Sequence, residues 1–226
     1  MMTMKIPLGL LGLLGLWVAA SAQAYIDYVP MMSVGAWNNV SNVYAAEWQK
    51  HIGKPAAAAP RSTVVESRGS AAVASTLASA YPAAQRAEAQ RVFESLLGEF
   101  AKVEQHFGLP RHDLASAVAV FITGSFEAYH DISIAPEHFK ALVNQMRGII
   151  GSDRQFARAS NAEKQQTFEQ LAILGMFMAG VQTELKRSPN PRIATNMKQA
   201  AKGYLEQFLK TDADRVQITA NGLELR

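Results

Sequence analysis

Residues 127–131, with the sequence EAYHD, hold the densest group of side chains that could perform acid–base or metal chemistry. Glu127 and His130 are three positions apart, so on a helix they share one face. Di-metal carboxylate proteins use such Glu-x-x-His pairs, but they need two copies and two further glutamates. We find one copy, and the nearby Glu104 and His106 have the wrong spacing for one helix face. The alternative interpretation is that Glu127 and His130 solvate a helix end, where an imidazolium near free carbonyls is mildly favourable.

Other signatures of catalysis are missing from the sequence. The chain has no cysteine, which excludes thiol catalysis, cysteine zinc sites and iron–sulfur clusters. It contains no Gly-x-Ser-x-Gly, no glycine-rich phosphate loop and no His-Glu-x-x-His. The sequence therefore predicts no catalytic residue and no cofactor. A metal-dependent or hydrolytic enzyme built on Glu127 and His130 stays as the alternative.

Methionines offer a second route to metal binding. Methionine clusters can bind copper(I) outside the cytoplasm, and four methionines fall in predicted helices: Met146, Met176, Met178 and Met197. More often, methionine fills irregular gaps in a hydrophobic core. We favour the core interpretation.

The first 24 residues have the pattern of a cleaved secretory signal. Lys5 gives a positive start, residues 6–20 are apolar, and Ala22 and Ala24 are small residues at the positions that a signal peptidase reads. An uncleaved membrane anchor is the competing interpretation, but a spanning helix needs roughly 20 apolar residues. We therefore expect an exported bacterial protein, periplasmic or secreted, that begins at Tyr25.

Charge and hydropathy limit the partners of the exported chain. The formal net charge is +3, with lysine and arginine scattered among the acidic residues, which is no electrostatic footprint for nucleic acid. The next most apolar run, residues 171–181, fits a buried core helix better than a membrane span. We expect no nucleic-acid binding and no stable membrane span after signal cleavage.

Residues 25–52 form an aromatic-rich arm with no clear periodicity. It could form short strands, bind a partner or wrap over a helical core. Its candidate binding residues are Trp37, Tyr44 and Trp48. Residues 53–80 are rich in Ala, Pro, Ser and Gly, which is typical of a low-complexity linker, although its last ten residues could be weakly helical.

Residues 81–226 are predicted to form the folded domain. Apolar side chains at spacings of three and four indicate helices. The five expected helices lie near residues 82–108, 113–129, 136–151, 160–186 and 190–208. Ser160 and Glu163 have the spacing of a capping box, which predicts where the fourth helix begins. Gly124 is small enough to let another helix approach closely.

In the last residues, the spacing of the apolar side chains changes from three and four positions to every second position. Residues 216–219 alternate, Asn221-Gly222 is a two-residue turn signal, and residues 223–225 alternate again. A lone hairpin is marginal in water, so we expect it to pack on the helices or to pair with a strand of the arm.

Three stretches resemble a family of exported bacterial proteins of unknown function: VFESLL at 92–97, FARASNAEKQ at 156–165 and ITANGL at 218–223. The layout also resembles that family, with a signal, an Ala- and Pro-rich spacer, a helical domain and a short terminal segment containing glycine. The resemblance implies export and helical architecture, and it transfers no catalytic residue.

Together these observations predict a mainly α fold, a five-helix bundle-like domain with a short C-terminal β-hairpin and an irregular N-terminal arm. The function that they favour is non-enzymatic binding or protein interaction in the bacterial cell envelope. The partner would be an envelope protein or a small ligand.

Overall fold

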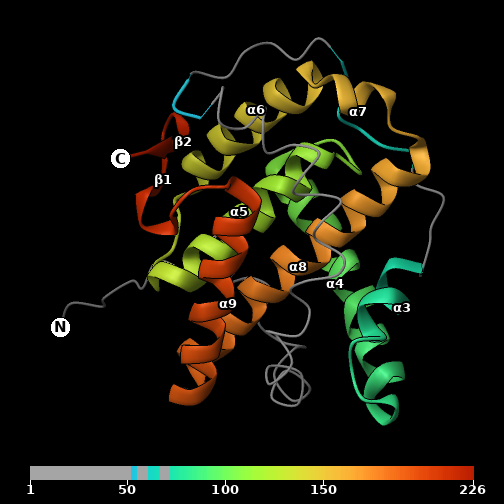
Figure 1. The fold of residues 1–226 in the computed structure, drawn as a ribbon, viewed down its shortest axis with the longest axis vertical. Helices are drawn as coiled ribbons and strands as arrows, with labels where there is room; N and C mark the ends of the chain where they lie inside the picture. The colour runs from blue at the N-terminus through green and yellow to red at the C-terminus, as the bar shows by residue number, and fades with distance from the viewer. Residues whose placement is uncertain (1–51, 55–60, 67–71) are drawn as a thin grey trace.

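The structure is a computed structural model, and it describes residues 52–54, 61–66 and 72–226. This part is mainly helical and ends in a short antiparallel hairpin (Figure 1). Its α-helices are α3 (Ala72–Ala78), α4 (Arg86–Phe107), α5 (Leu114–His130), α6 (Pro136–Ser152), α7 (Arg154–Arg158), α8 (Asn161–Arg187) and α9 (Pro191–Leu209). Two 3-10 turns, η3 (Ala83–Gln85) and η4 (Ala213–Arg215), precede α4 and the hairpin, whose strands are β1 (Val216–Thr219) and β2 (Gly222–Leu225).

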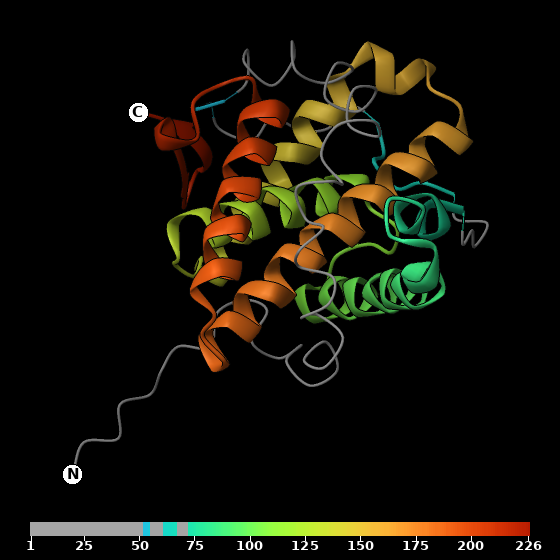
Figure 2. The same cartoon turned by 60° about the horizontal axis from the view of Figure 1, so that its bottom comes forward.

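Helices α5 and α8 cross at the centre of the domain, with α4 on one side and α9 on the other (Figures 1 and 2). Their contact is the most extensive in the described part of the chain. A Cβ atom added to Gly124 would lie 2.6 Å from the carbonyl oxygen of Gly175, and one added to Gly175 would lie 2.6 Å from the amide nitrogen of Phe121. Glycine at both positions therefore lets the two backbones touch, as predicted for Gly124.

The described residues contain seven α-helices, so the prediction of five was wrong in number. Helix α3 lies in the stretch that its composition predicted to be a linker. Val73 and Leu77 are four positions apart and buried, because α3 packs against α4 and α8. Helix α7 is a single short turn that begins when the Asp153 side chain accepts the Phe156 N–H.

The five longer helices lie where the apolar spacing predicted them. Ser160 and Glu163 form the reciprocal capping box that starts α8. Asn190 caps α9 by accepting the Ile193 N–H, and Pro191 occupies the first turn. Gly108 ends α4 in the left-handed conformation, with φ 65°.

Residues 61–66 are also packed, although they too fell within the predicted linker. Val65 donates its N–H to the carbonyl of His112, and Leu114 donates its own to the carbonyl of Thr63. The Thr63 hydroxyl donates to the buried carboxylate of Asp113. This segment therefore lies along the start of α5.

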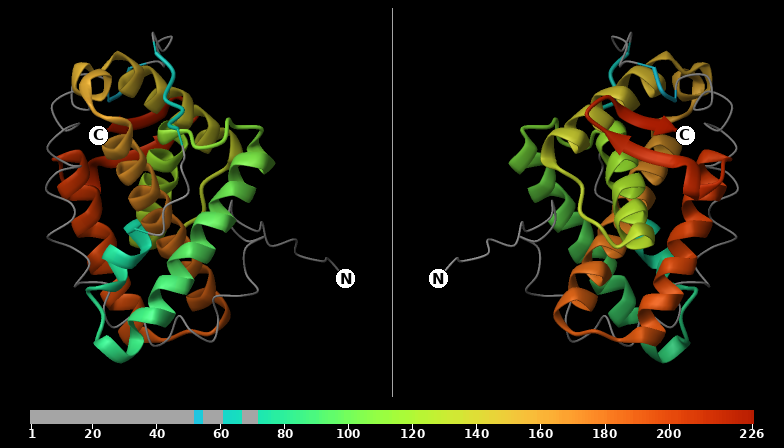
Figure 3. Two further views of the ribbon diagram at one scale, coloured as in Figure 1. Left: turned by 90° about the vertical axis from the view of Figure 1, so that its right-hand side faces the viewer. Right: turned by 90° about the vertical axis from the view of Figure 1, so that its left-hand side faces the viewer.

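The terminal hairpin packs against α6 (Figure 3), so the first of the two predicted placements is correct for the described residues. Thr219 pairs with Gly222 and the two turn residues are Ala220 and Asn221, so the turn lies one residue before the predicted Asn221-Gly222. Leu223 is completely buried between the hairpin and the helices. Within the described part of the chain, no helix is both long and apolar enough to span a membrane.

Candidate functional site

Glu127 lies one turn before the end of α5 and is 5% exposed. Its Oε1 accepts the backbone N–H of Ile134 at 2.7 Å, so the carboxylate holds the loop that leads into α6. Burial raises the pKa of Glu127 to about 7, partly offset by this hydrogen bond and by the charge of Lys186. The carboxylate that the sequence singled out for chemistry is thus engaged in closing a loop.

The neighbours of Glu127 have other partners. The His130 ring packs against Phe126 and Tyr129, with ring centroids 4.4 and 4.6 Å apart. Burial lowers the pKa of His130, which favours the neutral imidazole. Asp131 takes the left-handed conformation that ends α5, and its side chain accepts a hydrogen bond from Gln182 of α8. Residues 127–131 therefore contact different parts of the domain.

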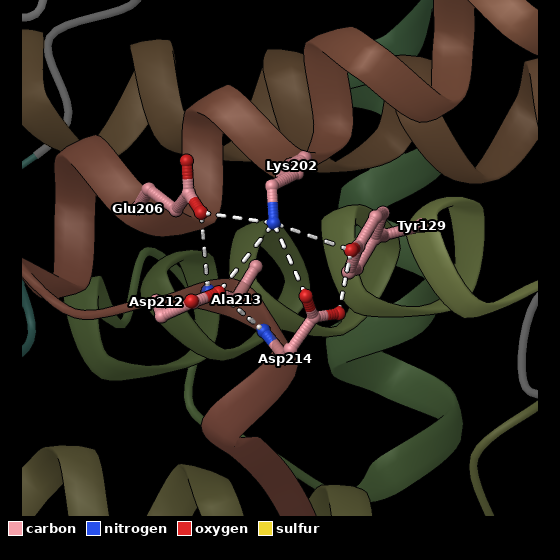
Figure 4. A network of polar contacts seen from close by, with 6 residues as sticks. All are labelled: Tyr129, Lys202, Glu206, Asp212, Ala213 and Asp214. Atoms are coloured by element: carbon pink, nitrogen blue, oxygen red, sulfur yellow. Dashed lines mark hydrogen bonds and ion pairs between the residues drawn. The ribbon is translucent and has the colours of Figure 1, made fainter.

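Tyr129 belongs to a polar network that connects α5, α9 and η4 (Figure 4). Its hydroxyl donates to Asp214 at 2.6 Å, and the Lys202 ammonium donates to the Tyr129 oxygen at 3.3 Å. Lys202 also pairs with three carboxylates, at 3.1 Å from Glu206 and 3.4 Å from each of Asp212 and Asp214. This network is the largest cluster of charged side chains around the end of α5.

The electrostatics of this network oppose its use as a reactive site. The hydrogen bond to Asp214 raises the pKa of Tyr129, because ionising the phenol would place two negative charges together. Hydrogen bonds to Glu206 and Tyr129 raise the pKa of Lys202. At neutral pH the phenol therefore keeps its proton and the amine its charge, so neither is an activated base or nucleophile.

A second polar cluster, which the sequence did not reveal, lies at the start of α5. The Asp113 carboxylate is fully buried and accepts from Thr63, from Ser116 and from the Arg147 guanidinium of α6, whose nitrogens lie 2.8 and 2.7 Å away. Asp113 also caps α5 by accepting the N–H of Ala115. Its position just before an apolar run was the available signal, since aspartate is favoured at helix N-termini.

Glu104 of α4 supports the same corner of the domain. Its Oε1 accepts the Asp113 N–H at 3.2 Å, and its Oε2 lies 3.2 Å from Nε of Arg111. Burial raises the pKa of Glu104 to about 7. Asp113 and Glu104 thus join residues 61–66, α4, α5 and α6 through charged hydrogen bonds, which is a structural role.

The structure describes some of the predicted site residues and leaves others outside the described ranges. Among the described residues, no group of three or more His, Cys, Asp or Glu side chains could hold a metal ion, so Glu127 and His130 gain no third ligand there. Met146, Met176, Met178 and Met197 are buried in the core. The predicted binding residues Trp37, Tyr44 and Trp48, the predicted arm before residue 52 and the predicted signal at residues 1–24 lie outside the described residues.

Comparison with family models finds a match to this chain. The model of a family of unknown function, DUF6683, matches residues 20–226. No curated protein and no solved structure matches the chain. The match agrees with the resemblance of the sequence to a family of unknown function and covers the whole helical domain. The chain belongs to this family of unknown function, DUF6683.

Proposed function

We propose that this chain is an exported, non-enzymatic binding protein of the bacterial cell envelope, periplasmic or secreted. The helical domain serves as a scaffold, and the aromatic arm contacts the partner through Trp37, Tyr44 and Trp48. The partner is an envelope protein or a small ligand.

The observation that carries this proposal is the state of the polar groups at the end of α5. Glu127 closes a loop, Tyr129 donates to Asp214, and Asp131 accepts from Gln182. Each group is already bound to a part of the domain, and an acid–base site would have to give up these contacts. These three contacts favour a scaffold, although the buried Nε2 of His130 has no hydrogen-bond partner among the described residues.

The surface composition supports the arm as the contact region. In the described residues, the large hydrophobic side chains with substantial exposure are Val64 and Ile132, at 45% and 44%. Tryptophan and tyrosine contribute most of the binding energy in many interfaces. The arm supplies five of these aromatic side chains within residues 25–52.

Photo-crosslinking in the host envelope tests the proposal. A benzophenone amino acid replaces Trp37 or Trp48 in turn, and the matched control carries it at Ile132, an exposed apolar site on the domain. We expect one discrete adduct from the arm positions, absent at position 132. The adduct should disappear when the other tryptophan is also changed to alanine, while the thermal unfolding of the chain stays the same.

Equal labelling from the arm and from position 132 would contradict the arm as the binding region. So would adducts that persist after the second tryptophan is removed. Turnover of a substrate that is lost in Glu127→Gln would favour the enzyme instead.

A further inference from the structure

Three segments that are distant in sequence meet at the side chain of Gln145. This residue lies on α6 and is 2% exposed. Its Oε1 accepts the N–H of Leu223 at 2.7 Å, and its Nε2 donates to the carbonyl oxygens of Leu223 at 3.1 Å and Lys54 at 3.4 Å. Gln145 therefore holds both the terminal hairpin and the residues directly after the arm.

Residues 52–54, which we call the arm base, also contact the hairpin directly. Gly53 donates its N–H to the Leu223 carbonyl at 3.0 Å, and Ile52 is half-buried against the hydrophobic core. A carbonyl oxygen has two lone pairs, and that of Leu223 uses them for Gly53 and for Gln145. Arm base, hairpin and α6 thus share one set of hydrogen bonds.

The fit around Gln145 is close. Gly222 has φ +102°, a conformation that L side chains rarely adopt, and a Cβ there would lie 2.6 Å from Oε1 of Gln145. The Gln145 amide accepts one hydrogen bond through its oxygen and donates two through its nitrogen. A shorter side chain, or one that only accepts, could not make all three bonds. This explains why a glycine follows the turn residue Asn221 in the terminal segment.

We propose that Gln145 is a positioning residue that fixes the base of the aromatic arm to the C-terminal hairpin. Residues 52–54 are then fixed at one defined place beside β2, and they and the hairpin are held or released together. This inference rests on the proposed function, since it assigns how the binding arm is oriented. It adds that the chain joins the domain next to the hairpin, directly after the arm.

The test measures amide hydrogen exchange in the whole chain, produced with residues 1–24 in place, at pH 7.5. Gln145→Glu keeps an acceptor for the Leu223 N–H but removes both donors and sets a carboxylate against two carbonyl oxygens. Gly222→Ala disturbs the same contact from the hairpin side and leaves Gln145 intact. The control is Asn144→Ala, an exposed neighbour on α6.

We expect the Gly53 and Leu223 amides to exchange at least about tenfold faster in both variants, while the Phe121 amide in α5 reports global unfolding and changes less. Asn144→Ala should match the wild type. Gly53 exchange within about twofold of the wild type in both variants would overturn the proposal, since the arm base would then not depend on Gln145. Equal acceleration at Gly53 and Phe121 would also overturn it, by showing a general loss of stability.

A second experiment tests the effect on binding by repeating the photo-crosslinking from position 37 in the Gln145→Glu variant. We expect the adduct yield to fall, with the tryptophans themselves unchanged. An unchanged yield would contradict the orienting role. If the wild type gives no specific adduct, the proposed function fails, whereas the exchange rates at Gly53 still decide the structural inference.

Discussion

Glu127 and Ile134 are joined by a hydrogen bond of 2.7 Å from the backbone N–H of Ile134 to the Glu127 carboxylate. Both residues are buried, at 5% and 6% exposure. The bond bridges the turn between α5 and α6, where the N–H of Ile134 would otherwise have no partner in the described structure. A residue that looks catalytic in the sequence thus satisfies a buried backbone donor.

Replacing Glu127 tests this role. Glu127→Ala leaves the Ile134 N–H buried without an acceptor, which should lower the free energy of unfolding by about 1–3 kcal/mol. Glu127→Gln keeps an acceptor oxygen of the same reach and should cost less than Glu127→Ala. Urea unfolding of both variants measures the difference. Equal losses would show that the hydrogen bond to Ile134 is not what the side chain contributes.

The same carboxylate predicts a pH dependence of stability. Burial raises the pKa of Glu127 from 4.5 to about 7, so between these values the folded state binds more protons than the unfolded state. Its contribution to stability is therefore fully present below pH 4.5 and is lost as the pH rises through about 7. We expect the wild type to lose stability relative to Glu127→Gln between pH 5 and 8. The histidines titrate in both proteins, so their contribution cancels in the difference between the two free energies of unfolding. A difference that stays constant with pH would contradict the raised pKa of Glu127.

The crossing of α5 and α8 predicts opposite effects for two kinds of glycine. Gly124→Ala pushes a methyl group into the Gly175 carbonyl and should destabilise the protein by about 2 kcal/mol or more. Gly98→Ala is the matched control, because that glycine is exposed within α4 and nothing lies within 4 Å of its added Cβ. It should stabilise the protein by about 0.5–1 kcal/mol, since alanine has the higher helix propensity. Thermal unfolding of the two variants measures both signs, and a Gly124→Ala variant that is as stable as Gly98→Ala would contradict the close crossing.

The network around Tyr129 predicts that the pKa of its phenol is raised. The hydrogen bond to Asp214 is the main cause of its raised pKa. Asp214→Asn should therefore lower the pKa of Tyr129 toward its usual value near 10, as followed by NMR titration of the ring resonances. Asp212→Asn, which changes a neighbouring carboxylate that has no hydrogen bond to the phenol, should have the smaller effect. A pKa that Asp214→Asn leaves unchanged would contradict this geometry.

Apolar spacing and helix caps predicted the five longer helices α4, α5, α6, α8 and α9 well, but not the short α7. Ser160 with Glu163, and Asn190 with Pro191, are local signals, because the capping atoms lie within three residues of each other. The signal for the terminal hairpin was equally local, although its turn is Ala220-Asn221, one residue before the predicted Asn221-Gly222.

The parts that the sequence did not predict depend on long-range contacts. Helix α3 was expected only as a weak helix within a linker, and its packing against α4 and α8 makes Val73 and Leu77 core residues. The long-range partners of Asp113 and Gln145, which are Thr63, Arg147, Leu223 and Lys54, are 34–91 residues away along the chain. No spacing rule reveals such pairs, so both clusters were missed. In the predicted site, helical spacing placed Glu127 and His130 together but carried no information about Ile134, whose N–H binds Glu127.

Native mass spectrometry of the protein recovered from its host's envelope distinguishes a binding arm from an enzyme site. We expect a chain that begins at Tyr25 and binds a partner through the arm, with the complex lost in the Trp37→Ala, Trp48→Ala variant and retained in Glu127→Gln. A bound metal ion or small molecule that persists without the tryptophans and disappears in Glu127→Gln would contradict it.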